Sequence, residues 1–278
     1  MRTANISAWM IAGAMSLSGS LAMAEEVAGR PVDKAIGFQR AVTEVARDIE
    51  WLDNFLLIII TAITVFVTLL MLIVIVRFNK RANPKPAAFT HNPTLEVAWT
   101  AIPVLILVII AIPSLRLLFL QLEVPEPDLT IKATGNQWYW SYEYPDQEIE
   151  FDALMLQKDE LTDYGYTAED WLLATDTRVV VPVNAVVHVL VTASDVLHAW
   201  TIPSFGSKID AVPGRINETW FRAEETGIFF GQCSELCGMN HAFMPIVVEV
   251  VSQEDYDAWT QTQQAMNATA TTKLAAAE

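Results

Sequence analysis

Hydrophobic and polar positions divide the chain into two unlike parts. Before residue 123, long apolar stretches occur at the N-terminus, at 55–76 and at 97–115, whereas later residues alternate short apolar runs with polar turns. The stretch 55–76 has 22 residues and no charge, and 97–115 is also uncharged. About 20 apolar residues span the bilayer core as a helix. The pattern therefore predicts transmembrane helices at 55–76 and 97–120.

The N-terminal stretch has a different character. Arg2 precedes a run of small and apolar residues that ends in Ala22-Met23-Ala24, before two glutamates. This pattern is typical of a secretory signal peptide at 1–24, with an uncleaved anchor helix as the alternative.

The loop at 77–96 indicates the orientation of the two predicted spans. It carries four basic residues, Arg77, Lys80, Arg81 and Lys85, against the single acid Glu96. Basic loops stay on the cytoplasmic side. We therefore expect a bacterial-type inner membrane protein, with this loop in the cytoplasm and everything after residue 122 on the periplasmic side.

A periplasmic segment at 25–54 precedes the first predicted span. Its apolar residues recur at spacings of three and four, at Phe38, Val42, Val45, Ile49 and Leu52. This periodicity predicts an amphipathic helix over about 33–53. The apolar face could lie on lipid or on a partner subunit, and the sequence does not choose between them.

Residues 123–252 have the pattern of an all-β domain. Seven short runs rich in β-branched and aromatic residues alternate with Pro, Gly, Asn and Asp, which predicts a sandwich or barrel. The stretch 153–174 breaks this pattern, and we interpret it as an irregular insertion with some helix. Residues 253–278 predict a short helix capped by Ser252, followed by a polar tail.

Charge is distributed unevenly along the chain. From Pro125 onward there are 24 acidic and seven basic residues, a net charge of −17, although the whole chain carries −16. Such a domain repels nucleic acid and anionic lipid, so we expect neither as a partner. A basic protein partner suits it better.

The two cysteines of the chain both lie in the stretch GQCSELCGMNHAFMPI, residues 231–246. A disulfide is one interpretation, because exported cysteines often pair. The neighbours favour a metal site, since Cys233, Cys237, His241 and Met244 fall within twelve residues and His198 lies upstream. Soft sulfur with imidazole suits copper, and a thioether is a poor zinc ligand. A single blue-copper site needs only one thiolate.

Two thiolates can instead bridge two copper ions. Each ion then takes one histidine, and Met244 and a backbone carbonyl of the loop fill the remaining positions. One electron shared by two bridged ions changes the geometry little, so electron transfer has a small reorganisation cost.

The motif C-S-E-L-C-G-x-N-H-x-x-M-P-I resembles the CuA loop of subunit II of aa3-like haem–copper cytochrome c oxidases. GNQWYWSYEY, LLATDTRVVVPVN and the upstream S-D-V-L-H-A-W add to the resemblance. It implies a two-helix transmembrane hairpin followed by a cupredoxin-like Greek-key barrel. It also implies that Cys233 and Cys237 bridge two copper ions, that His198 and His241 each bind one, and that Met244 and the Glu235 carbonyl complete the site. The Glu235 side chain would reach a magnesium or manganese ion shared with subunit I.

The resemblance further implies a function in the respiratory chain. Subunit II would accept electrons from cytochrome c and pass them to haem in subunit I, in a complex with subunits I and III that reduces O2 and pumps protons. Trp138 would be the point where electrons enter, and Glu96, three residues before Trp99, would mark the entrance of a proton pathway. Acids that match the docking positions for cytochrome c are Glu143, Asp152, Asp163, Asp176 and Asp195.

Other functions remain open at this point. The main alternative is a membrane-tethered copper chaperone or thiol redox sensor that uses Cys233 and Cys237 as a dithiol. A copper-free quinol oxidase subunit would lack the ligands that are present here, and the CuA domain of nitrous-oxide reductase would lack the membrane hairpin. A structural disulfide module would leave both histidines and Met244 unexplained.

Overall fold

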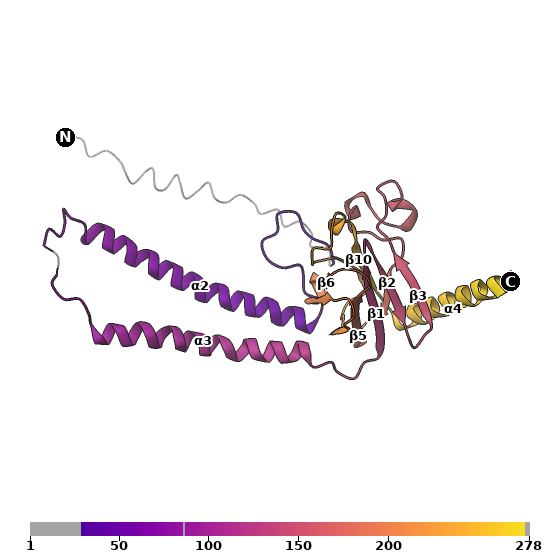
Figure 1. Cartoon of the computed structure of the whole chain (residues 1–278), viewed down its shortest axis with the longest axis horizontal. Helices are drawn as coiled ribbons and strands as arrows, with labels where there is room; N and C mark the ends of the chain where they lie inside the picture. Colours follow the sequence, from indigo (N-terminus) through magenta and orange to yellow (C-terminus); the bar gives the residue numbers. More distant parts are fainter. Residues whose placement is uncertain (1–28, 86, 276–278) are drawn as a thin grey trace.

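The computed structural model describes residues 29–275 apart from residue 86, so the predicted signal peptide at 1–24 lies outside the described residues. Two long helices, α2 (Glu44–Arg77) and α3 (Pro93–Leu122), form a hairpin beside a β domain. They run side by side, and the turn between them lies at the end of the hairpin away from the strands (Figure 1). The C-terminal helix α4 (Gln253–Ala275) projects from the opposite side of the β domain (Figure 1).

Helix α2 begins at the cap residue Thr43, whose hydroxyl accepts a hydrogen bond from the Ala46 N–H at 3.0 Å. The predicted amphipathic helix over 33–53 is therefore wrong in its bounds. Residues 33–43 are not helical, and the helix continues without a break into the predicted span. Of this apolar series, Val42 and Val45 are buried within the chain itself, while Phe38 is exposed.

Both hairpin helices are long and apolar enough to cross a membrane. Helix α3 contains Pro103 and Pro113 and starts at Asn92, whose side chain accepts hydrogen bonds from two backbone N–H groups of the first turn. The most apolar 18-residue windows are 0 % and 6 % buried inside the molecule. Such bare apolar surface fits contact with lipid or with other membrane helices.

The β domain is a cupredoxin-like barrel of two main sheets. One sheet has the order β3-β2-β1-β5-β8, the second has the order β4-β10-β9, and β6 and β7 form a separate antiparallel pair. Strands β1 and β5 are parallel, as are β4 and β10, and the other neighbours are antiparallel. The strands are β1 (Leu129–Asn136), β2 (Tyr139–Tyr144), β3 (Ile149–Ala153), β4 (Val179–Pro182), β5 (Val187–Ala193), β6 (His198–Ile202), β7 (Ser207–Ala211), β8 (Asn217–Phe221), β9 (Gly227–Gln232) and β10 (Pro245–Val251).

The core between the sheets is rich in aromatic residues, including Trp140, Trp200 and Phe229. Cys233 and Cys237 belong to this same buried cluster. The loop with the candidate ligands therefore closes one part of the core, where packing excludes water.

The predicted insertion and the C-terminal cap are both present. Between β3 and β4 the chain forms two short 3-10 helices, η1 (Leu161–Tyr164) and η2 (Ala168–Asp170), over a second small core. Ser252 accepts a hydrogen bond from the Asp255 N–H at 3.1 Å at the start of α4. The polar tail differs from prediction, because the helix continues through residue 275.

Hydrogen bonds and ion pairs fasten the start of α2 to the β domain. The Val42 N–H donates to the Ser204 carbonyl and the Val42 carbonyl accepts from the Glu224 N–H, both at 3.0 Å. Arg47 forms a bidentate ion pair with Glu224, and both N–O distances are 2.8 Å. These contacts fix the barrel on the hairpin.

Candidate metal centre

Four side chains form a row of imidazole, thiol, thiol and imidazole. The Sγ of Cys233 lies 3.8 Å from the Nδ1 of His198 and 4.0 Å from the Sγ of Cys237, which lies 3.7 Å from the Nδ1 of His241. The Met244 Sδ is 3.5 Å from the Cys237 Sγ. Both cysteines are free. The fold therefore brings together all the soft ligands expected from the sequence.

Strands β1, β6 and β9 position His198 and Cys233. His198 is the first residue of β6 and is fully buried against Gly135 of β1, where an added Cβ would lie 2.9 Å from the imidazole. Cys233 directly follows β9, and the next residue, Ser234, donates its N–H to the Ala199 carbonyl at 3.1 Å. This bond holds the cysteine loop against β6 and so brings Cys233 to His198.

The second half of the loop is shaped by η4 (His241–Phe243), which begins at His241. Met244 follows it and is almost completely buried just before β10. His241 is only half-buried, whereas His198 is fully buried. The two ends of the row therefore differ in exposure, and the His241 end is nearer to solvent.

Asp195 holds His198 in one orientation. Its Oδ1 lies 2.9 Å from the His198 Nε2, and its carboxylate also accepts from the backbone N–H groups of Gln137 and Val196. Because Nε2 is bound to the carboxylate, Nδ1 is the nitrogen that faces Cys233. Such carboxylate–histidine contacts orient metal-binding imidazoles. The sequence analysis assigned Asp195 to docking and missed this contact, although its position three residues before a candidate ligand was a signal.

Gln137 ties β1 to the cysteine loop, and no sequence signal pointed to it. Its side-chain amide donates to the Cys237 carbonyl at 2.7 Å. Trp138 lies beside it, and an added Cβ on Gly238 would lie 3.3 Å from the Trp138 ring. Trp138, which the resemblance would place at the surface as the point of electron entry, is partly buried and packs on the core. Within the described chain its buried Nε1 has no hydrogen-bond partner.

The two thiols differ in acidity. Burial opposes ionisation of Cys233, but hydrogen bonds with His198 and with backbone groups outweigh it and lower the pKa of this thiol to about 7. Burial and the charge of Cys233 together raise the pKa of Cys237 to about 12. Near neutral pH the metal-free pair therefore keeps at least one proton, and a metal ion bound by both sulfurs must displace it.

The pKa values of His198 and Asp195 move in opposite directions. Burial disfavours the imidazolium of His198, yet its hydrogen bonds with Cys233 and Asp195 outweigh burial and raise its pKa. Burial likewise opposes the charge of Asp195, but hydrogen bonds from His198 and two backbone N–H groups lower the pKa of this carboxyl. Asp195 therefore stays ionised beside the histidine.

Glu235 lies between the two cysteines with its side chain exposed. Its backbone carbonyl is turned inward and lies 3.3 Å from the Cys233 Sγ. This residue can thus offer a carbonyl oxygen to the sulfur cluster and a carboxylate to the outside of the domain.

The donor arrangement could hold a soft metal ion. His198, Cys233 and Cys237 have ligand atoms that all lie within 4.8 Å of one another, and among the described residues His241 stands outside this group. A tetrahedral zinc site needs its four donors around one point. The two histidines contact different sulfurs at opposite ends of the row.

Three of the four other expected docking acids have local partners. Glu143 of β2 forms an ion pair with Lys132 at 2.6 Å, and Asp152 of β3 accepts from the Ser141 hydroxyl at 2.6 Å. Asp176 accepts from the Leu154 N–H, and Asp163 is exposed in the first turn of η1. These acids thus divide between strands β2 and β3 and the insertion.

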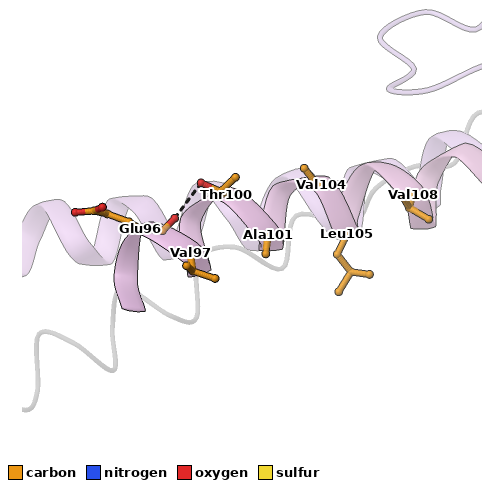
Figure 2. Close-up of a pocket in the computed structure, with 7 residues that line it drawn as sticks. All are labelled: Glu96, Val97, Thr100, Ala101, Val104, Leu105 and Val108. Carbon is orange, nitrogen blue, oxygen red and sulfur yellow. Dashed lines mark hydrogen bonds between the residues drawn. The ribbon is translucent and has the colours of Figure 1, made fainter. Parts of the chain in front are cut away.

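Glu96 lies in the first turn of α3, at the end of the hairpin far from the β domain (Figure 1). It is partly exposed and sits at one end of a row of mainly apolar side chains that continues to Val108 (Figure 2). These side chains line a shallow depression of about 760 Å³. The structure does not bring Glu96 near the cysteine loop.

Two family models match the chain. "Cytochrome C oxidase subunit II, periplasmic domain" matches residues 129–251, and "Cytochrome C oxidase subunit II, transmembrane domain" matches residues 31–117. The chain is 54 % identical over 248 residues to cytochrome c oxidase subunit 2 of Cereibacter sphaeroides. This match covers 84 % of this chain and 82 % of that protein. It is 51 % identical over 233 residues to a probable cytochrome c oxidase subunit 2 of Rickettsia bellii, covering 84 % and 85 %.

Among solved structures, the chain is similar to the periplasmic domain of subunit II of cytochrome oxidase from Bradyrhizobium japonicum. The identity is 54 %, the match covers 52 % of this chain and 99 % of that one, and the TM-score is 0.47. The two family models match the hairpin and the barrel, and the relatives match over most of their length. The chain belongs to the cytochrome c oxidase subunit II family and is thus a subunit of a haem–copper oxidoreductase.

Proposed function

We propose that this chain is the subunit through which the oxidase receives electrons, and that its cysteine loop holds the two copper ions of a CuA centre. The observation that carries the proposal is the row His198–Cys233–Cys237–His241, in which neighbouring donor atoms lie 3.7–4.0 Å apart. The two thiolates would be shared by both ions. Met244 and the Glu235 carbonyl would each complete one coordination sphere.

When bound, the copper pair supplies a one-electron acceptor whose geometry changes little on reduction. The residues of the chain support this in three ways. Packing buries Cys233, Cys237 and Met244 and so excludes water. Asp195 keeps the Nδ1 of His198 facing the sulfur, and the lowered pKa of Cys233 reduces the cost of forming the first thiolate.

Cytochrome c is the electron donor that we propose. Trp138 would be the point where electrons enter, because its ring lies against Gly238, next to Cys237. The net charge of −17 beyond residue 124 would attract a basic donor and accelerate its association. Acids that would contribute are Glu143, Asp152, Asp163, Asp176 and Asp195, although Asp195 already serves His198 and Glu143 is paired with Lys132.

The remaining roles concern the assembled complex. The chain would pass electrons to haem in subunit I, with subunit III as a further partner, for O2 reduction coupled to proton pumping. The Glu235 carboxylate would bind magnesium or manganese together with subunit I, and Glu96 would mark the entrance of a proton pathway. The hairpin would span a bacterial-type inner membrane with the barrel on the periplasmic side.

Copper stoichiometry and electron spin resonance of the full chain in detergent test this proposal. After reduction, copper loading and desalting, we expect two copper ions per chain and one unpaired electron split by two copper nuclei. Met244→Leu should keep both ions and change the potential, because a thioether is a weak ligand. One copper with a single-nucleus spectrum, or none with a Cys233–Cys237 disulfide, would favour a copper chaperone or redox sensor instead.

The dependence of the reaction on ionic strength tests docking of cytochrome c separately from the copper assignment. Reduction of the copper-loaded chain by cytochrome c should slow steeply as salt rises, because screening weakens the attraction between opposite charges. A rate that is independent of salt would contradict acidic docking and leave the copper assignment unaffected.

A further inference from the structure

A cavity of about 570 Å³ lies at the end of the hairpin nearest the β domain, apart from the copper loop. Helix α2 contributes Asp48, Trp51 and Phe55 to its wall, and helix α3 contributes Pro113 and Arg116. The rest of the lining is aliphatic. The cavity therefore combines a large apolar surface with one acid and one base, which come from different helices.

The depth of this cavity in a membrane follows from the sequence. Arg116 is 19 residues beyond Val97, the first residue of the uncharged run on α3. At 1.5 Å per residue this is about 28 Å, close to the thickness of the hydrocarbon core, about 30 Å. On α2, Phe55 begins the uncharged run and Asp48 precedes it by two turns. The cavity thus lies at the outer boundary of the bilayer, at the level of lipid headgroups.

Arg116 lacks a partner inside the described chain. Its side chain is exposed, and no hydrogen bond or ion pair with another described residue satisfies it. The helix around it is apolar from Pro113 to Leu120, apart from Ser114. A guanidinium in such a position prefers an anionic partner with two acceptor oxygens, and both phosphate and carboxylate can bind its N–H donors in this bidentate way.

Asp48 supplies the opposite charge without neutralising Arg116. Among the described residues these two side chains form no ion pair, although both line the same cavity. Arg47 is next to Asp48 on α2 and carries the opposite charge. Its guanidinium is already bound to Glu224. The cavity thus presents a separate cation and anion, and an occupant with both charges would satisfy them together.

Trp51 and Phe55 form the aromatic part of the cavity. Their rings stack with centroids 5.4 Å apart and an angle of 8° between their planes, and Trp51 is 57 % exposed. Tryptophan at the boundary of a membrane typically lies among lipid headgroups. An exposed, stacked pair at this depth therefore favours lipid as the occupant over water.

We propose that this cavity binds one phospholipid with a phosphate and a primary ammonium group, that is, a phosphatidylethanolamine. Its phosphate would bind Arg116, its ammonium would donate to Asp48, and its acyl chains would lie along the exposed apolar faces of α2 and α3. A trimethylated choline headgroup has no N–H to donate to Asp48. An anionic headgroup would be repelled by Asp48 and by the barrel, with its net charge of −17.

Lipid retention by the full chain tests the assignment. The chain is reconstituted in nanodiscs with equal amounts of phosphatidylethanolamine, phosphatidylcholine and phosphatidylglycerol, returned to detergent, and analysed by native mass spectrometry. We expect one retained phosphatidylethanolamine per chain. Arg116→Gln should reduce its occupancy at least tenfold, and Asp48→Asn should abolish the preference over phosphatidylglycerol. Arg81→Gln and Glu50→Gln are matched controls, because they remove an exposed charge outside the cavity.

Copper content of each variant shows that it is folded. Retention that Arg116→Gln does not change would overturn the proposal, as would equal retention of all three lipids by the unmodified chain. If Arg116→Gln instead releases subunit I from the purified complex while lipid stays bound, Arg116 pairs with a carboxylate of that subunit, and the lipid site is refuted.

Discussion

Replacement of Asp195 by Asn tests whether this acid orients a copper ligand rather than serving only as a surface charge. Asp195 accepts three hydrogen bonds, from the His198 Nε2 at 2.9 Å, the Gln137 N–H at 2.7 Å and the Val196 N–H at 2.6 Å. Asparagine has the same shape but only one acceptor oxygen. It therefore weakens the contact with His198 and leaves one N–H facing an amide that cannot accept.

The expected loss follows from the type of hydrogen bond. A hydrogen bond to a charged group contributes about 1.5–3 kcal/mol. The Asp195 side chain is 32 % exposed, so we take the lower end of this range. About 1.4 kcal/mol is a factor of ten in a binding constant, and loss of a carboxylate behind a metal-binding histidine typically weakens metal binding 10- to 100-fold. We expect Asp195→Asn to hold copper about tenfold more weakly.

Competition with a copper chelator measures this loss in the full chain, with the copper spectrum recorded in parallel. Asp152→Asn is the matched control, because it removes the same charge from an exposed acid whose partner is Ser141 and not a ligand. It should hold copper as tightly as the unmodified chain. If both variants retain copper normally and slow the reaction with cytochrome c equally, Asp195 acts only in docking and the reasoning fails.

Three other predictions concern packing, thiol chemistry and electron transfer. Chemical unfolding should show that Gly206→Ala lowers the stability of the full chain by about 1–3 kcal/mol more than Gly214→Ala. Both glycines have positive φ, but only at Gly206 would the added Cβ lie within 3 Å of atoms of α2. In metal-free protein, alkylation of Cys233 should rise with pH through about 7, since only the thiolate reacts, and mass spectrometry at pH 8 should find Cys237 far less modified. Trp138→Phe should slow reduction by cytochrome c and leave the copper spectrum unchanged, and an altered spectrum would mean that this ring supports the loop.

Local patterns in the sequence predicted the features that depend on neighbouring residues. The uncharged runs predicted both long helices, because a span needs only length and apolarity. The spacing from Cys233 to Met244 predicted the sulfur cluster, because one loop carries most of its donors. Alternating runs predicted seven strands, but β3 and β7 were missed, because both carry charged residues at their exposed positions.

Contacts between distant segments were not predictable in the same way. The apolar period from Phe38 to Leu52 indicated a helix, yet the chain before Thr43 is held in a nonhelical form by backbone hydrogen bonds between Val42 and the residues Ser204 and Glu224. The amide of Gln137 reaches a carbonyl 100 positions away. No local period records such contacts, because they depend on how the strands pair.

The cysteine loop separates two kinds of potential metal ligand by depth. Cys233, Cys237 and Met244 are buried, whereas the Glu235 side chain between the cysteines is exposed. Soft ions prefer the sulfur donors inside, and magnesium or manganese prefers a carboxylate. Among the described residues, no cluster of three potential ligands includes Glu235. A hard ion at this carboxylate would take its further ligands from water or from another chain, and this is why we propose a site shared with subunit I.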